Sequence, residues 1–152
     1  MSQSLSNVIV HIIYSTKNRQ RWLTGAGLRA ELGAYNATIL KNEVDSLAIL
    51  VNSGEDHIHI LCSLSRKLAI MDVIKASKTE TSKWIKKRDP AFREFQWQAG
   101  YGIFSVSQSN VDQVKQYIAN QEEHHRKRTF KDEFREFCKR HQIEIDERYV
   151  WD

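Results

Sequence analysis

Two histidines separated by a single residue, His57 and His59, are the side chains here with the clearest chemical potential. Around them Ile58, Ile60 and Cys62 recur with a period of two, which predicts a strand. Side chains alternate across a strand, so the histidines share one face and the apolar residues share the other. Two neighbouring imidazoles on a rigid strand can bind a divalent ion through their nitrogen lone pairs. The same pattern also fits two polar residues on the solvent-exposed face of a half-buried strand.

A second group of candidate side chains lies on a helix predicted over residues 110–125. Tyr117, Gln121 and His124 follow one another at spacings of four and three, so they form one stripe on that helix. A metal held by two histidines needs further ligands, and a reaction there would need a nucleophile. The amide and the phenol could supply these, although a half-buried tyrosine and a solvated glutamine fit the same stripe.

The hydrophobic periodicity predicts the elements that must position these side chains. Apolar, β-branched runs predict strands, and apolar residues at spacings of three and four predict amphipathic helices. In chain order these are a strand over 5–14, a helix over 26–41, a hairpin over 46–64 with its turn at 52–55, a helix over 68–87, a strand over 101–107, and helices over 110–125 and 129–141. The tail, 143–151, is predicted to be a short extended segment that docks on another surface.

This order predicts an α+β fold: a ferredoxin-like β-α-β-β-α-β antiparallel sheet, with additional C-terminal helices that carry the tyrosine. We expect one domain over 1–152, with the ferredoxin-like core in 1–108 and the tyrosine helix, final helix and tail in 109–152. In this arrangement the first and third strands are central, and both crossover helices cover one sheet face. The histidine pair would then lie at the middle of the open face, accessible to solvent.

Composition narrows the class of protein. The chain has 152 residues and is 41% hydrophobic, which is enough for a core. No apolar run approaches the roughly 20 residues of a membrane span, and the first residues do not resemble a signal peptide. We therefore expect a cytoplasmic protein with no membrane partner. Cys62 and Cys138 are far apart without a C-x-x-C spacing, so a disulfide framework or a structural zinc site is not expected.

Clusters of basic residues favour a polyanionic partner. The net charge is +4, and Lys and Arg are concentrated after the first predicted strand and on the predicted helix over 68–87. Such clusters favour nucleic acid, because counterions released from its phosphates drive binding, although a solvated helix face has the same composition. Trp97 could stack on an unpaired base or belong to the core. The basic candidates for DNA contact are Lys17, Arg19, Arg21, Lys75, Lys78 and Lys83.

The chain resembles the small HUH single-tyrosine transposases, which mobilise bacterial insertion sequences as single-stranded DNA, and their relatives associated with repetitive extragenic palindromes. The resemblance extends over nearly the whole chain in one order. The matching segments are Tyr14-Ser15-Thr16-Lys17-Asn18-Arg19, Asp56-His57-Ile58-His59-Ile60, the stretch 97–107, Tyr117-Ile118-Ala119-Asn120-Gln121 and the tail 143–151.

The resemblance implies specific roles. His57 and His59 would bind the metal, usually Mg²⁺ or Mn²⁺, and Gln121 would be the third ligand. Tyr117 would attack a DNA phosphodiester and form a 5′-phosphotyrosine link, which another 3′-hydroxyl then resolves. The protein would be a bacterial homodimer that recognises hairpins near element ends and acts at the nucleoid, and the tyrosine helix could complete the partner's site. The family's hinge glycine before that helix is absent from 105–110.

Other functions fit parts of the sequence. A non-catalytic nucleic-acid-binding module on the same sheet, or a host-retained relative, would keep the basic clusters, but a simple binding module would not need His57, His59, Tyr117 and Gln121 together. A phosphoesterase of the paired-histidine type needs two H-x-[ST] motifs, which this chain lacks. A plasmid relaxase uses similar chemistry but is normally longer and carries a third histidine in its motif.

Overall fold

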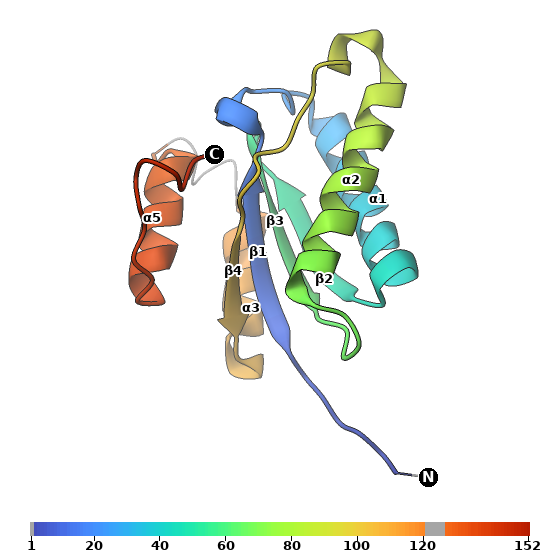
Figure 1. Cartoon of the computed structure of the whole chain (residues 1–152), viewed down its shortest axis with the longest axis vertical. Coiled ribbons are helices and arrows are strands. Elements are labelled where there is room, and N and C mark those ends of the chain that lie inside the picture. Colours follow the sequence, from blue (N-terminus) through green and yellow to red (C-terminus); the bar gives the residue numbers. More distant parts are fainter. Residues whose placement is uncertain (1, 121–126) are drawn as a thin grey trace.

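Four strands form one antiparallel sheet in the computed structural model, which describes residues 2–120 and 127–152 (Figure 1). The strands are β1 (Ile9–Ser15), β2 (Leu47–Ser53), β3 (His57–Ser63) and β4 (Gly102–Val106). Their order across the sheet is β2-β3-β1-β4, and each neighbouring pair is antiparallel. The first and third strands are therefore central, and the predicted ferredoxin-like α+β order is confirmed.

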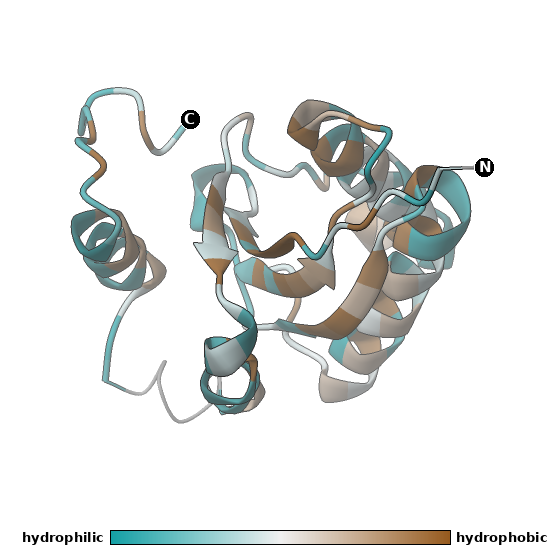
Figure 2. Cartoon of the chain, turned by 90° about the horizontal axis from the view of Figure 1, so that it is seen from below, coloured by the Kyte–Doolittle hydropathy of each residue, from teal (hydrophilic) through white to brown (hydrophobic). Residues whose placement is uncertain are grey.

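The central strands are buried on both faces. Every residue of β1 is buried, which explains why its sequence IVHIIYS shows little alternation between polar and apolar side chains. Figure 2 shows the apolar strands in the middle of the molecule, between the helices.

One face of the sheet packs against α1 (Ala26–Val44) and α2 (Ile70–Arg88). The alternate residues of β3 that point there are Ile58, Ile60 and Cys62, as their period of two predicts. Tyr14 of β1 points to the same side, and its hydroxyl oxygen lies 2.6 Å from that of Ser77 on α2. These contacts fix the orientation of β3, so its histidines must project from the opposite face.

That opposite face is covered, contrary to the open face that the sequence predicts. Helices α3 (Val111–Ala119) and α5 (Phe130–Arg140) pack on it. The reason is apolar burial: Ile13 and Phe104 on the sheet meet Phe130 and Phe134 of α5 in one cluster. Short 3-10 turns at Lys17–Arg19, Pro90–Phe92 and Gln108–Asn110 link the larger elements.

The C-terminal elements differ from prediction in detail. The helix predicted over 110–125 ends at Ala119, and residues 121–126 lie outside the described part of the chain. The tail docks on its own chain, but through turns rather than as an extended strand. The Arg19 guanidinium donates to the carbonyl oxygen of Trp151 over 2.9 Å. The backbone N–H of Gly100 donates to the carbonyl oxygen of Asp152 over 2.8 Å. Among the described residues, no helix is both long and apolar enough to cross a lipid bilayer.

Candidate active site

The histidine pair of β3 lies beneath the C-terminal helices. His57 and His59 share the face that carries α3 and α5, as their spacing predicts, but both are fully buried. The predicted solvent-accessible position is therefore wrong. The ring of Phe130 on α5 lies 5.0 Å from the ring of His57 and helps to close the site from above.

Each imidazole has a polar neighbour on its Nδ1 atom. Asp56 Oδ1 lies 2.6 Å from His57 Nδ1, and His11 Nε2 lies 2.7 Å from His59 Nδ1. Burial, followed by the neighbouring His59, lowers the pKa of His11 well below its usual value, so this ring is neutral at pH 7. Partners on Nδ1 orient the rings so that both Nε2 atoms face the same space.

A carboxylate from α5 occupies that space. Glu133 Oε1 lies 3.1 Å from His59 Nε2, and Glu133 Oε2 lies 3.8 Å from His57 Nε2. One ligand atom from each of the three residues lies within 4.8 Å of the others. The arrangement brings two imidazoles and one carboxylate together in a buried position, which is a donor set suited to a divalent cation.

Tyr117 reaches the same carboxylate from α3. Its hydroxyl donates a hydrogen bond to Glu133 Oε1, and its ring centroid lies 6.1 Å from that of His59. Burial raises the pKa of the Tyr117 phenol, and the negative charge of Glu133 raises it further. The predicted stripe of Tyr117, Gln121 and His124 is described only at its first residue, because the other two lie outside the described residues.

Sequence reasoning missed Glu133 and His11. Glu133 follows Phe130 by three residues and precedes Phe134 and Phe137, so it lies within an apolar helix face. His11 interrupts the apolar run of β1 in the same way. A single ionisable residue on an apolar face was the available signal, because such a group is seldom buried without a partner.

Several predicted DNA-contacting residues make contacts within the chain. Lys78 donates to the carbonyl oxygens of Gln98, Ala99 and Gly100 over 2.8, 3.1 and 2.7 Å. It thus holds the loop before β4, as Arg19 holds the tail.

The other basic candidates remain at the surface. Arg21 lies 3.8 Å from Glu55, and Lys83 lies 3.5 Å from Glu80, while Lys17 and Lys75 are exposed. Trp97 is only 8% exposed and donates to the hydroxyl oxygen of Thr81, so it belongs to the core rather than to a stacking surface. Lys75, Lys78 and Lys83 all lie on α2, across the sheet from the histidine pair.

The fold is that of known transposases. The chain is similar to the crystal structure of a putative transposase from Deinococcus radiodurans, with a TM-score of 0.60 and 21% identity over 80% of this chain and 98% of that one. It is also similar to the structure of a REP-associated tyrosine transposase bound to a REP hairpin, with a TM-score of 0.52 and 10% identity over 78% of this chain and 68% of that one.

The sequence comparison is more specific. The chain is 28% identical to the ISDra2 transposase TnpA of Deinococcus radiodurans over 122 residues, which cover 73% of this chain and 81% of the relative. The family described as "Transposase IS200 like" matches residues 4–121. The chain belongs to this family of tyrosine transposases, which are enzymes that cut and rejoin DNA.

Proposed function

We propose that this protein cuts and rejoins single-stranded DNA at hairpin-marked ends through a covalent intermediate on Tyr117. The observation that carries the proposal is the hydrogen bond from the Tyr117 hydroxyl to Glu133, directly beside the buried pair of His57 and His59. A phenol, a carboxylate and two imidazoles from three separate elements of one chain meet at this point. Such a meeting suits a nucleophile held next to a cation-binding site.

The three clustered residues fit a divalent metal ion. Their donor atoms lie within 4.8 Å of one another, and the set combines nitrogen with carboxylate oxygen. His57, His59 and Glu133 would hold the ion, with Gln121 remaining a predicted further ligand. When bound, Mg²⁺ or Mn²⁺ would supply positive charge to the phosphate oxygens, and the histidines favour Mn²⁺ in vitro.

The residues of the chain perform the remaining tasks. Asp56 and His11 hold the two imidazoles in one orientation through their Nδ1 atoms. Glu133 positions the Tyr117 oxygen and is the group placed to take the phenolic proton, because it already accepts that hydrogen bond. Burial and the carboxylate keep the phenol protonated until substrate arrives.

The strand-transfer reaction then balances without a nucleotide cofactor. The Tyr117 oxygen bonds to phosphorus while the bond from phosphorus to the 3′-oxygen breaks, which leaves a 5′-phosphotyrosine and a free 3′-hydroxyl. Attack by a different 3′-hydroxyl reforms the phosphodiester and releases the tyrosine. The link stores the bond energy between the two steps.

The DNA and assembly partners belong to the same proposal. A hairpin-bound structural relative supports recognition of DNA hairpins, and exposed Lys17, Lys75 and Lys83 would contact phosphates. We treat 1–108 as the core that carries the histidines and 109–152 as the part that carries Tyr117 and Glu133. The protein would act as a homodimer, in the cytoplasm where its DNA is found.

A gel assay for a covalent protein–DNA adduct tests this function. Purified protein is mixed with labelled single-stranded hairpin oligonucleotides from its genomic flanks, with MnCl₂ or with EDTA. We expect a metal-dependent adduct that Tyr117→Phe abolishes while hairpin binding is retained. Tyr149→Phe is the matched control, because this tyrosine is 64% exposed and is not in the site.

An adduct that survives in Tyr117→Phe would refute the assignment of the nucleophile. Tight hairpin binding with no adduct under any metal would instead indicate a non-catalytic DNA-binding protein.

A further inference from the structure

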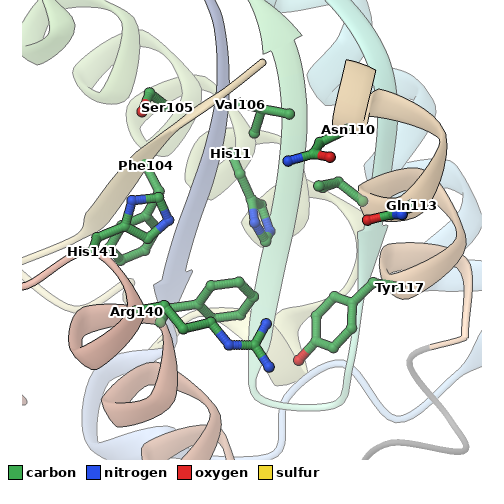
Figure 3. Close-up of a pocket in the computed structure, with 11 residues that line it drawn as sticks. His11, Phe104, Ser105, Val106, Asn110, Gln113, Tyr117, Arg140 and His141 are labelled. Atoms are coloured by element: carbon green, nitrogen blue, oxygen red, sulfur yellow. The ribbon is translucent and has the colours of Figure 1, made fainter. Parts of the chain in front are cut away.

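A pocket of about 370 Å³ opens beside Tyr117, between β4, α3 and α5 (Figure 3). Its volume falls within the range of small-ligand sites. The pocket shares Tyr117 with the candidate active site, and it is also lined by His11, which contacts His59. A group bound in the pocket would therefore be next to the proposed nucleophile.

Aromatic rings form one part of the pocket wall. Phe104 of β4 and Phe137 of α5 stack with their centroids 5.6 Å apart, and His141 lies 4.8 Å from Phe104. The Tyr117 ring meets Phe137 at 5.5 Å in an edge-to-face contact. Such surfaces stack on unpaired nucleobases with little sequence preference, because every base has a π-face.

Polar groups face the same space. Asn110 and Gln113 line the pocket where α3 begins, and their amides can both donate to and accept from a base edge. Arg140 lines it from α5, and Figure 3 shows its side chain extending toward Tyr117. Its side chain is 63% exposed and pairs with Glu136 at 3.2 Å, so a phosphate can reach the guanidinium.

We propose that this pocket binds one unpaired nucleotide of the DNA strand, next to the phosphate that Tyr117 attacks. The base contacts the aromatic wall and the two amides, and the adjoining phosphate contacts Arg140, which is a positioning residue. The inference rests on the proposed function, since it needs a DNA strand at Tyr117. A base within a duplex is stacked on both sides and cannot enter without being flipped out, so the pocket selects single-stranded DNA.

Binding measurements in the Tyr117→Phe background test this pocket, because no adduct can form there. Fluorescence anisotropy reports the affinity for single-stranded hairpin oligonucleotides that carry one abasic position, moved stepwise along the unpaired flank. We expect one position to weaken binding by about tenfold, as loss of one stacked base does, with the other positions nearly neutral.

Two matched pairs of variants connect that position to the pocket. Gln113→Glu places a carboxylate in the pocket, whereas Gln116→Glu makes the same charge change on an exposed position of α3 outside it. Arg140→Gln removes the pocket's guanidinium, whereas Lys139→Gln removes a neighbouring exposed charge. We expect about tenfold weaker binding for the first member of each pair only. The oligonucleotide that is abasic at the sensitive position already lacks the base in the pocket, so Gln113→Glu should not weaken its binding further.

Equal losses within both pairs, or the absence of a sensitive position, would overturn the proposal. If one abasic position still weakens binding but the unmodified protein forms no covalent adduct, the proposed chemistry is refuted and the nucleotide pocket is supported. Melting temperatures of the four variants show whether each remains folded.

Discussion

At the scale of single residues, Glu133 connects the proposed metal site with the proposed nucleophile. The same carboxylate faces both histidines and accepts the hydrogen bond from Tyr117. A carboxylate that is 2% exposed needs such partners, because an isolated buried charge is costly. The geometry of the whole site therefore depends on Glu133, since moving this carboxylate would disturb the imidazoles and the phenol together.

The substitution Glu133→Gln tests this dual role. The amide keeps the shape of the side chain but loses the charge, so we expect affinity for Mn²⁺ to fall by at least about tenfold. The measurement is the rise in melting temperature on titration with MnCl₂, together with the yield of the covalent adduct. Glu43→Gln is the control, because this carboxylate is exposed on α1, on the other side of the sheet from the site. An unchanged Mn²⁺ response would remove Glu133 from the metal site.

At the scale of elements, the hairpin turn between β2 and β3 is shaped around His57. A Cβ atom added at Gly54 would lie 2.6 Å from His57 Cε1, closer than real side chains approach. The turn therefore needs glycine for space rather than for a left-handed backbone, since no glycine among the described residues has a positive φ. The ring orientation of His57 thus depends on a residue with no side chain.

The substitution Gly54→Ala is expected to push the His57 ring away from Glu133. We predict a loss of about 1–3 kcal/mol in the free energy of unfolding, the usual cost of overpacking, and a weaker Mn²⁺ response. Chemical denaturation with and without MnCl₂ measures both effects. Gly27→Ala provides the comparison, because a Cβ there meets nothing within 4 Å. Equal stabilities for the two variants would show that the turn can relax around the methyl group.

The hydrophobic patterns of the strands and helices explain which features could be predicted from the sequence. The period of two in β3 predicted which face carries His57 and His59, because alternation is a local property of strands. The burial of that face could not be predicted, since it depends on where α3 and α5 dock after the sheet has formed. Glu133 was missed for the same reason: its contact with His59 joins distant parts of the chain, and an acid on a helix is usually solvated.

At the scale of the whole molecule, one chain supplies all the groups of the described site. Tyr117 from α3 and Glu133 from α5 meet the histidine pair of their own β3. The resemblance noted from the sequence implies that a partner's tyrosine helix could complete the site instead. Tyr117 already lies beside the histidine pair within the single chain, so we predict the arrangement within one chain.

Mixing two inactive variants distinguishes these arrangements. Tyr117→Phe lacks the nucleophile, and His57→Ala lacks one metal ligand, so a mixed dimer regains a complete site only if subunits exchange tyrosine helices. We expect no covalent adduct from the mixture, measured after co-expression and purification of the mixed species. Mixed dimers of either variant with the unmodified chain should retain adduct formation. Recovery of the adduct in the variant mixture would show that the helices are exchanged.

The burial of the histidines affects how tightly the protein binds DNA. His57 and His59 expose no surface, so a DNA phosphate can touch them only in molecules where the side chains that cover them, such as Phe130, have moved aside. The apparent affinity for substrate is then reduced by the fraction of molecules that are open. A DNA that binds the open form more tightly supplies the free energy of opening, whereas a DNA that binds both forms equally does not. Concealment of the reactive groups would thus protect the rest of the genome from unprogrammed cuts.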